Sequence, residues 1–136
     1  MTAEYTTKQV RHLFFEREGQ RCFYCRRVLS FQLRGSLLDG GWSIHHRKGR
    51  GAGMNTYSNG IVLCGTGGPA KSGPVKNCHD EVTRNPSWAY EMGLAILRNA
   101  TTAEYQPQNV RVRDRAGRWF LLTEHGRAVE VEGPNR

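Results

Sequence analysis

The sequence of 136 residues has no long apolar run and only four cysteines. A helix that crosses a bilayer needs about 20 consecutive apolar residues, so the sequence predicts no transmembrane helix. The N-terminal stretch MTAEYTTKQVRHLFFEREGQ also lacks the apolar core of a signal peptide. We therefore expect a cytosolic protein whose thiols stay reduced, which disfavours disulfides. A chain of this length predicts one domain with a modest core, which a bound metal would help to stabilise.

Acidic residues are absent from Gly40 to His79, although the chain contains 12 Asp and Glu against 20 Lys and Arg. The same segment contains three of the five histidines. Its basic residues are Arg47, Lys48, Arg50, Lys71 and Lys76. Part of the net charge of +8 is thus concentrated around these histidines. Such a segment favours a polyanionic partner such as nucleic acid over the alternative, a solvated loop whose charge has no role.

Apolar periodicity and turn residues predict a mixture of helices and strands. An amphipathic helix is expected over residues 7–18, where apolar residues recur at helical spacing and a glycine follows. The further elements expected are a weak strand at 28–33, strands at 42–47 and 61–64, helices at 79–83 and 86–98, and two or three strands with tight turns from 109 to 132. An Asn-Pro pair would begin the 86–98 helix. This order of elements predicts an α+β fold.

The four cysteines follow the pattern C-x2-C-x38-C-x13-C, which is typical of a metal site more than of a disulfide. Cys22 and Cys25 form a tight knuckle that can place two sulfurs on one ion. With Cys64 and Cys78 they would complete a closed tetrahedral zinc site, although the spacing of the second pair is loose. A thioredoxin-like redox pair would require a neighbouring βαβ unit, and the pattern contains none. Partly used or free thiols remain the alternative.

Two adjacent histidines occur in the expected strand at 42–47. His45 could bind a metal while His46, neutral near pH 7, accepts a proton from water. His79, at the start of an expected helix, could be the second ligand. Two protein ligands would leave coordination positions for water and phosphate, as a catalytic metal requires. A His-His pair considered by itself is more often a surface feature without function.

The order of these motifs resembles the HNH endonuclease family, in particular its small phage-encoded members. The resemblance covers roughly residues 20–97. It is carried by the motifs CFYC (22–25), SIHHRKGRG (43–51), SNGIVLC (58–64) and NCHDEV (77–82). No single motif is specific, but their combination in this order is.

The resemblance implies a ββα-metal core, in which two strands and a helix hold one divalent ion. It implies that His46 is the general base and that His45 and His79 are the metal ligands. It also implies that Asn59 braces the loop that orients the base, with Asn55 as a rival and an ordinary Asn-Gly turn as the alternative. The four cysteines would hold a separate structural zinc ion.

Two features differ from the pattern of the family. Many members with a four-cysteine site carry Asp where this chain has His45. Histidine is a softer ligand, so the preferred ion would shift from Mg²⁺ toward Zn²⁺, Ni²⁺ or Mn²⁺. The second knuckle of the family is usually C-x-x-C, whereas 13 residues here separate Cys64 from Cys78. That insertion can shift His79 relative to the other ligand.

The sequence therefore predicts an α+β fold with a ββα-metal core, a four-cysteine zinc site, an N-terminal helix and a C-terminal β-hairpin. Residues 1–136 would form a single domain. Within it, we expect an N-terminal helix in 1–20, the nuclease core in 21–99, and a linker with a β element in 100–136.

The predicted function is metal-dependent hydrolysis of DNA by an HNH endonuclease that nicks one strand with modest sequence preference. Arg47, Lys48 and Arg50 are candidates for phosphate contacts, with simple solvation as an equal alternative. The expected cofactors are a structural Zn²⁺ and one catalytic divalent ion, and the expected partner is DNA. If the protein is phage-encoded, it would act in the cytoplasm of a bacterial host. The alternatives are a non-catalytic zinc-containing DNA-binding module and, more remotely, a redox protein.

Overall fold

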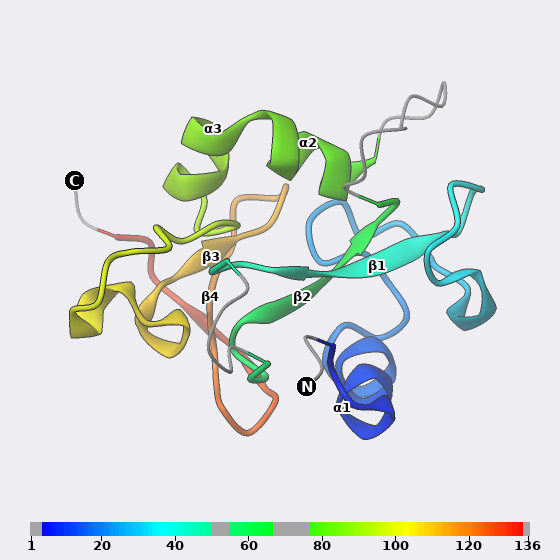
Figure 1. Cartoon of the computed structure of the whole chain (residues 1–136), viewed down its shortest axis with the longest axis horizontal. Coiled ribbons are helices and arrows are strands. Elements are labelled where there is room, and N and C mark those ends of the chain that lie inside the picture. The colour runs from blue at the N-terminus through cyan, green and yellow to red at the C-terminus, as the bar shows by residue number, and fades with distance from the viewer. Residues whose placement is uncertain (1–3, 50–54, 67–76, 135–136) are drawn as a thin grey trace.

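The computed structural model describes residues 4–49, 55–66 and 77–134 and shows a small α+β fold (Figure 1). Its elements in chain order are α1 (Thr7–Arg11), η1 (His12–Arg17), η2 (Phe31–Leu33), β1 (Trp42–His46), β2 (Gly60–Cys64), α2 (Cys78–Arg84), α3 (Pro86–Glu91), η3 (Ala103–Tyr105), η4 (Pro107–Asn109), β3 (Val112–Arg113), β4 (Trp119–Leu122) and β5 (Ala128–Val131). None of the helices within the described ranges combines the length and the apolar content that a membrane crossing requires.

The N-terminal helix begins with a capping box. The hydroxyl of Thr6 accepts a hydrogen bond from the backbone N–H of Gln9 at 3.2 Å, and the Gln9 side chain accepts one from the Thr6 N–H at 2.9 Å. After α1 the helix continues as the π-helical segment η1 and gives way to Gly19, whose φ is +64°. Leu13 and Phe14 are fully buried. The predicted N-terminal helix is confirmed.

An antiparallel strand pair, β1 and β2, crosses the centre of the molecule, with α2 and α3 on one side and α1 on the other (Figure 1). Trp42 lies opposite Cys64, and His46 lies opposite Gly60. All five residues of β2 are buried, which is why this strand reads as an unbroken apolar run. A Cβ at Gly60 would lie 2.6 Å from the hydroxyl oxygen of Tyr5, so the close approach of the two segments requires glycine there.

The outer edge of β2 is covered by groups from the N-terminal region. A carboxylate oxygen of Glu18 accepts a hydrogen bond from the Val62 N–H at 3.2 Å, and the Phe23 N–H donates to the Val62 carbonyl at 2.8 Å. Glu18 also binds the guanidinium group of Arg17 at 2.6 Å, and both side chains are buried. This edge therefore offers few unpaired backbone groups to another strand.

The helix expected over residues 86–98 is shorter than the periodicity predicts. It begins at Pro86 as expected but ends at Glu91. Gly93 follows with a φ of +73°, and a Cβ at this position would collide with the carbonyl oxygen of Arg111. The chain leaves the helix here because another segment passes directly against its backbone. Helical periodicity continued through the glycine, but this tertiary contact overrides it.

The C-terminal region forms a three-stranded antiparallel sheet in the order β3-β4-β5. Gly117 and Gly126 occupy its tight turns with φ values of +90° and +84°. Phe120 and Leu122 of β4 are buried in the same cluster as the N-terminal helix and β2. The Phe120 ring packs edge-on against Phe23, with centroids 5.8 Å apart. The predicted hairpin corresponds to β4 and β5, and β3 extends it.

A buried arginine closes the region in which β1 ends. Arg47 is 2% exposed, and its guanidinium group donates four hydrogen bonds of 2.6–3.0 Å to backbone carbonyls. These carbonyls belong to Ser58, Gly93, Pro107 and Val110. Burial lowers the pKa of the guanidinium group to about 9, so it stays protonated at neutral pH. The arrangement supplies donors to the Ser58, Gly93 and Val110 carbonyls, and adds a second donor to the Pro107 carbonyl, which also accepts from the Val110 N–H at 3.3 Å.

We predict that Arg47→Met destabilises the fold strongly. Methionine keeps the apolar part of the side chain but leaves the Ser58, Gly93 and Val110 carbonyls without this donor, whereas Pro107 still accepts from the Val110 N–H. Each unsatisfied buried group costs about 1–3 kcal/mol. We expect a loss of about 3 kcal/mol or more in the free energy of unfolding, measured by urea denaturation. The exposed Arg127 provides the control, because Arg127→Met should change stability by less than about 0.5 kcal/mol. Equal stability of the two variants would contradict the role given to Arg47.

Candidate metal centre

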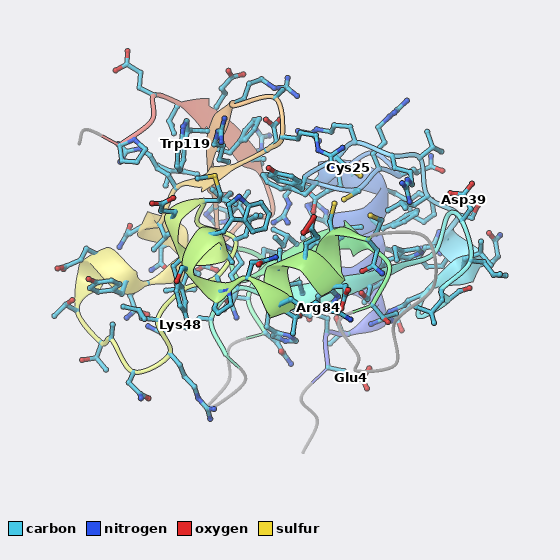
Figure 2. The ribbon with its side chains drawn as sticks, turned by 90° about the horizontal axis from the view of Figure 1, so that it is seen from above. Glu4, Cys25, Asp39, Lys48, Arg84 and Trp119 are labelled. Carbon is cyan, nitrogen blue, oxygen red and sulfur yellow. The ribbon has the colours of Figure 1, made fainter. Side chains whose placement is uncertain are left out.

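Four cysteine sulfurs from three separate segments meet beside α2 (Figure 2). The Sγ atoms of Cys22, Cys25, Cys64 and Cys78 all lie within 4.8 Å of one another, and Cys25 Sγ lies 3.8 Å from Cys64 Sγ. A zinc ion with Zn–S bonds of about 2.3 Å separates its sulfurs by roughly 3.8 Å in a tetrahedron. None of the four cysteines forms a disulfide. The predicted grouping is confirmed, and the cluster is compatible with a closed zinc site.

The wide spacing between Cys64 and Cys78 does not separate their sulfurs. Gly65, with a φ of +78°, lies so close to Asn77 that a Cβ would collide with the Asn77 side chain. Asn77 also begins α2, because its side-chain oxygen accepts a hydrogen bond from the Asp80 N–H at 2.7 Å. The Cys78 N–H then points at Cys64 Sγ at 3.3 Å. The two ends of the insertion therefore meet, and the cysteines at these ends come together.

Hydrogen bonds among the four thiols divide their protons unequally. A bond from Cys22 lowers the pKa of the Cys25 thiol far below its usual value and lowers the pKa of Cys64 to about 7. The bond to Cys25 raises the pKa of Cys22, and the bond to Cys22 raises the pKa of Cys78. Thiolate is the form that binds a metal, so the lowered pKa values of Cys25 and Cys64 favour the form that a zinc ion would bind.

His45 of β1 and His79 of α2 lie side by side, with ring centroids 5.0 Å apart and planes at 70°. His45 Nε2 lies 2.8 Å from the carbonyl oxygen of Leu94. His79 Nδ1 lies 2.5 Å from the hydroxyl oxygen of Ser43. That hydroxyl lies 2.6 Å from the carbonyl oxygen of Gly65, to which it donates. Each of the two rings therefore has one nitrogen bound to a protein oxygen.

These contacts indicate which ring nitrogen carries the proton. A carbonyl oxygen can only accept, so His45 donates from Nε2 and has its lone pair on Nδ1. Ser43 gives its single hydroxyl hydrogen to Gly65, so His79 donates from Nδ1, and in the neutral form of this ring the lone pair lies on Nε2. Burial, together with the neighbouring His79, lowers the pKa of His45 to about 3, so this ring is neutral. Metal-ligating histidines are held in the same way by their second nitrogen.

The two histidines do not form a complete cage. Among the described residues, the four cysteines are the only group of three or more His, Cys, Asp or Glu close enough to hold an ion. No further His, Cys, Asp or Glu side chain in the described part of the chain joins His45 and His79 in a group of three or more ligands.

His46 lies on the strand next to His45 but makes different contacts. Successive side chains of a strand point to opposite faces. The His46 ring packs against Tyr5, with centroids 5.1 Å apart, and its Nε2 donates to the side-chain oxygen of Asn55 at 2.8 Å. The Asn55 amide group in turn donates to the carbonyl oxygen of Glu4 at 2.9 Å. The structure thus pairs His45 with His79 and places Asn55 at the ring of His46.

Asn59 is fully buried and holds the backbone that follows β1. Its side-chain oxygen accepts from the Lys48 N–H at 2.7 Å, and its amide group donates to the Lys48 carbonyl at 3.1 Å. Its own carbonyl accepts from the Arg47 N–H at 2.8 Å. Asn59 and Asn55 therefore make separate contacts, one with the loop after β1 and one with the ring of His46.

The expected phosphate contacts require a correction. Arg47 binds interior carbonyls as described above, and Lys48 is 7% exposed with its ammonium group bonded to the carbonyls of Ala100 and Tyr105. Neither side chain faces a ligand in solvent. The sequence shows the charge of these residues but not the carbonyl groups that surround it. Arg50 lies outside the described residues.

Sequence reasoning missed several partners of the histidines. Ser43 could have been found, because it lies two positions before His45 and so shares its face of β1. The sequence near the histidines does not indicate the Leu94 carbonyl, which contacts His45, or Tyr5, which contacts His46. Both come from distant parts of the chain.

The fold and these contacts define a small α+β protein with a clustered four-cysteine site compatible with zinc. Comparison with known proteins found no matching family model, no matching curated protein and no matching solved structure.

We predict that protein purified without added metal contains one zinc ion per chain, bound by the four cysteines. Such a site contributes on the order of 10 kcal/mol to folding, so Cys64→Ser should lose both the ion and the folded state at ambient temperature. Elemental analysis measures the ion. A thiol reagent should find four reactive groups only after a chelator has been added. Four freely reactive thiols in the native protein would show that the site does not exist.

Proposed function

We propose that this chain is a metal-dependent endonuclease of the HNH type that hydrolyses DNA phosphodiester bonds. The proposal rests on the pairing of His45 and His79, whose rings lie 5.0 Å apart and each have one nitrogen bound to a protein oxygen. A strand pair followed by a helix brings them together. The elements β1, β2 and α2 would then be the ββα-metal core.

The paired histidines would hold a divalent ion that keeps open coordination positions. The ion would bind the lone pairs on His45 Nδ1 and His79 Nε2 and would neutralise charge that develops on the phosphate and on the leaving oxygen. Two imidazole ligands favour Zn²⁺, Ni²⁺ or Mn²⁺ over Mg²⁺. The second-nitrogen hydrogen bonds to Leu94 and Ser43 would keep both rings oriented before the ion arrives.

By the resemblance to the HNH family, His46 would act as the general base. Because it points to the face of β1 opposite His45, the water and the phosphate would have to lie at the end of the strand, within reach of both rings. With its Nε2 proton donated to Asn55, the lone pair lies on Nδ1. That nitrogen takes a proton from a water molecule as the water oxygen bonds to phosphorus, and the bond from phosphorus to the 3′ oxygen breaks. The 3′ oxygen then takes a proton from solvent, which gives 5′-phosphate and 3′-hydroxyl ends. Asn55 would orient the base, and Asn59 would hold the backbone beyond it.

A non-catalytic zinc-containing DNA-binding module is the second candidate. The cysteine cluster supports it equally well, because a structural zinc site is common to binding modules and enzymes. The two functions differ in their need for the histidine pair, since a binding module has no use for open metal positions. A redox role for Cys22 and Cys25 would require exposed, reactive thiols, which zinc binding would block.

We predict that His46→Ala abolishes cleavage while the fold and the affinity for DNA persist. Loss of a general base costs about 10²- to 10⁴-fold in rate. The assay follows the nicking of supercoiled plasmid with Mg²⁺, Mn²⁺, Ni²⁺ or Zn²⁺. His125, exposed in the turn between β4 and β5, is the matched control, and His125→Ala should cut at the normal rate.

Two outcomes of this assay would contradict the proposal. Cleavage at the normal rate by His46→Ala would rule out the base assignment. Failure of the unaltered protein to nick plasmid with any of the four ions, while it still binds DNA, would favour the non-catalytic module.

We also predict that Ser43→Ala weakens the binding of the catalytic ion. Without the hydroxyl, the Nδ1 proton of His79 loses its acceptor and the ring can turn. Loss of such a contact typically lowers metal affinity about 10- to 100-fold. The metal concentration for half-maximal nicking should rise by this factor, and excess metal should restore the rate. A lower rate that excess metal does not restore would instead point to general misfolding, which zinc content would reveal.

A further inference from the structure

Arg47 and Lys48 are buried, so a polyanion would have to bind other basic residues that reach the surface. Two short segments, RCFYCRR (21–27) and RVRDRAGR (111–118), are unusually rich in arginine. The structure joins them, because the Arg115 N–H donates to the carbonyl oxygen of Tyr24 at 3.0 Å. We call five arginines of these joined segments the arginine surface: Arg21, Arg115 and Arg118, which are exposed, and Arg26 and Arg27, which are half-buried.

This surface carries a large excess of positive charge. The acidic residue within these two segments is Asp114. Its carboxylate is buried and forms ion pairs with Arg26 at 3.3 Å and with Arg118 at 3.0 Å. Burial opposes ionisation of Asp114, but the hydrogen bonds from Arg118 and Arg26 outweigh it and lower the pKa of the carboxyl group. Five guanidinium groups against this carboxylate leave four positive charges, of which a neighbouring zinc ion with four thiolates, net −2, would offset two. Toward α2 the surface is bounded by Glu81, which lines a cleft of about 400 Å³ together with Arg115.

Aromatic rings hold several of these arginines in place. The guanidinium carbon of Arg115 lies 5.5 Å from the ring centre of Tyr24, and that of Arg118 lies 5.8 Å from the ring centre of Phe120. The side chains of Arg26 and Arg118 remain 35% and 48% exposed. A guanidinium group that lies over a ring keeps N–H donors at its edge for a ligand. Because the rings already restrict these arginine side chains, the side chains lose less conformational entropy when a ligand binds.

Arg26 occupies a position that normally favours glycine. Its φ is +66°, a left-handed conformation that costs about 1 kcal/mol or more for a residue with a side chain. This backbone places its guanidinium group 5.5 Å from the ring centre of Phe23 and 6.0 Å from that of Phe120. Glycine would adopt the same turn without strain but would remove this charge.

We propose that the arginine surface binds the phosphates of a DNA duplex. The choice of DNA as the polymer rests on the proposed nuclease function. Arginine suits phosphate because its planar fork binds two oxygens at once. The surface consists of guanidinium groups that cover aromatic rings, whereas proteins that enter a lipid bilayer expose apolar side chains to it. Contacts of this kind position a protein on the duplex without reading its sequence.

The test removes three positive charges from this surface and three from elsewhere. The surface variant is Arg21→Gln, Arg27→Gln, Arg115→Gln, which leaves the pairs with Asp114 intact. The control is Lys8→Gln, Arg11→Gln, Arg127→Gln, on α1 and the turn between β4 and β5. Fluorescence anisotropy measures binding to unrelated duplexes of about 25 base pairs at several salt concentrations, with no divalent ion added. Zinc content verifies that both variants are folded.

We expect the surface variant to bind at least about 10-fold more weakly on every duplex. The log–log salt slope should become shallower by about 2 to 3, since each lost phosphate contact removes roughly 0.9. The control should retain most of the affinity. Equal losses in the two variants, or tighter binding to vesicles that contain phosphatidylserine than to duplex DNA, would overturn the inference.

The nuclease proposal and this inference can fail separately. If the unaltered protein nicks plasmid but the surface variant binds duplex as tightly as the control, only the inference is wrong. If the unaltered protein binds through the arginine surface but no metal supports nicking, the nuclease function is wrong and the surface stands as a DNA-binding site.

Discussion

A single buried cation organises the part of the fold in which the histidines lie. The guanidinium group of Arg47 donates to backbone carbonyls from segments far apart in the sequence. Because arginine offers five N–H donors and stays charged, carbonyls that would otherwise lack donors can converge on it. Its own carbonyl accepts a hydrogen bond from the Ile96 N–H at 2.8 Å. The chain around Ile96 is thereby held against the end of β1, and this stretch supplies the Leu94 carbonyl that holds the ring of His45.

The cysteine cluster shows that nearness in space matters more than spacing along the chain. A four-thiolate site requires converging sulfurs but sets no length for the chain between them. The cost of closing a loop also rises slowly, by about 0.6 kcal/mol for each doubling of its length. Because Gly65 lies directly against the Asn77 side chain, the residue after Cys64 and the residue before Cys78 are adjacent in space. The loose pair, Cys64 and Cys78, therefore meets the same geometric requirement as the tight knuckle.

Local signals predicted the elements, and long-range contacts decided what the sequence could not show. The apolar run of β2, the N-terminal helix and the cysteine grouping follow from spacing and burial alone. The helix expected over 86–98 ends early, at Glu91, because Gly93 lies against the backbone of Arg111. The phosphate contact expected for Arg47 differs from the structure, because its guanidinium group donates to interior carbonyls, one of which lies 63 positions away along the chain. The pairing of His45 with His79 is expected from their chemistry as metal ligands and from the family resemblance, and no periodicity would have predicted it.

Cys78 and His79 are neighbours in the first turn of α2, yet they serve different groups. The sulfur of Cys78 belongs to the cysteine cluster, whereas the ring of His79 meets His45 and Ser43 of β1. Successive residues of a helix point about 100° apart, so one orientation of α2 sets both contacts. A zinc ion at the cysteines would clamp this turn to the end of β2 and to the knuckle, and the helix could not then rotate His79 away from His45. The ion in the closed site would take no part in the chemistry, but it would govern the alignment of the open one.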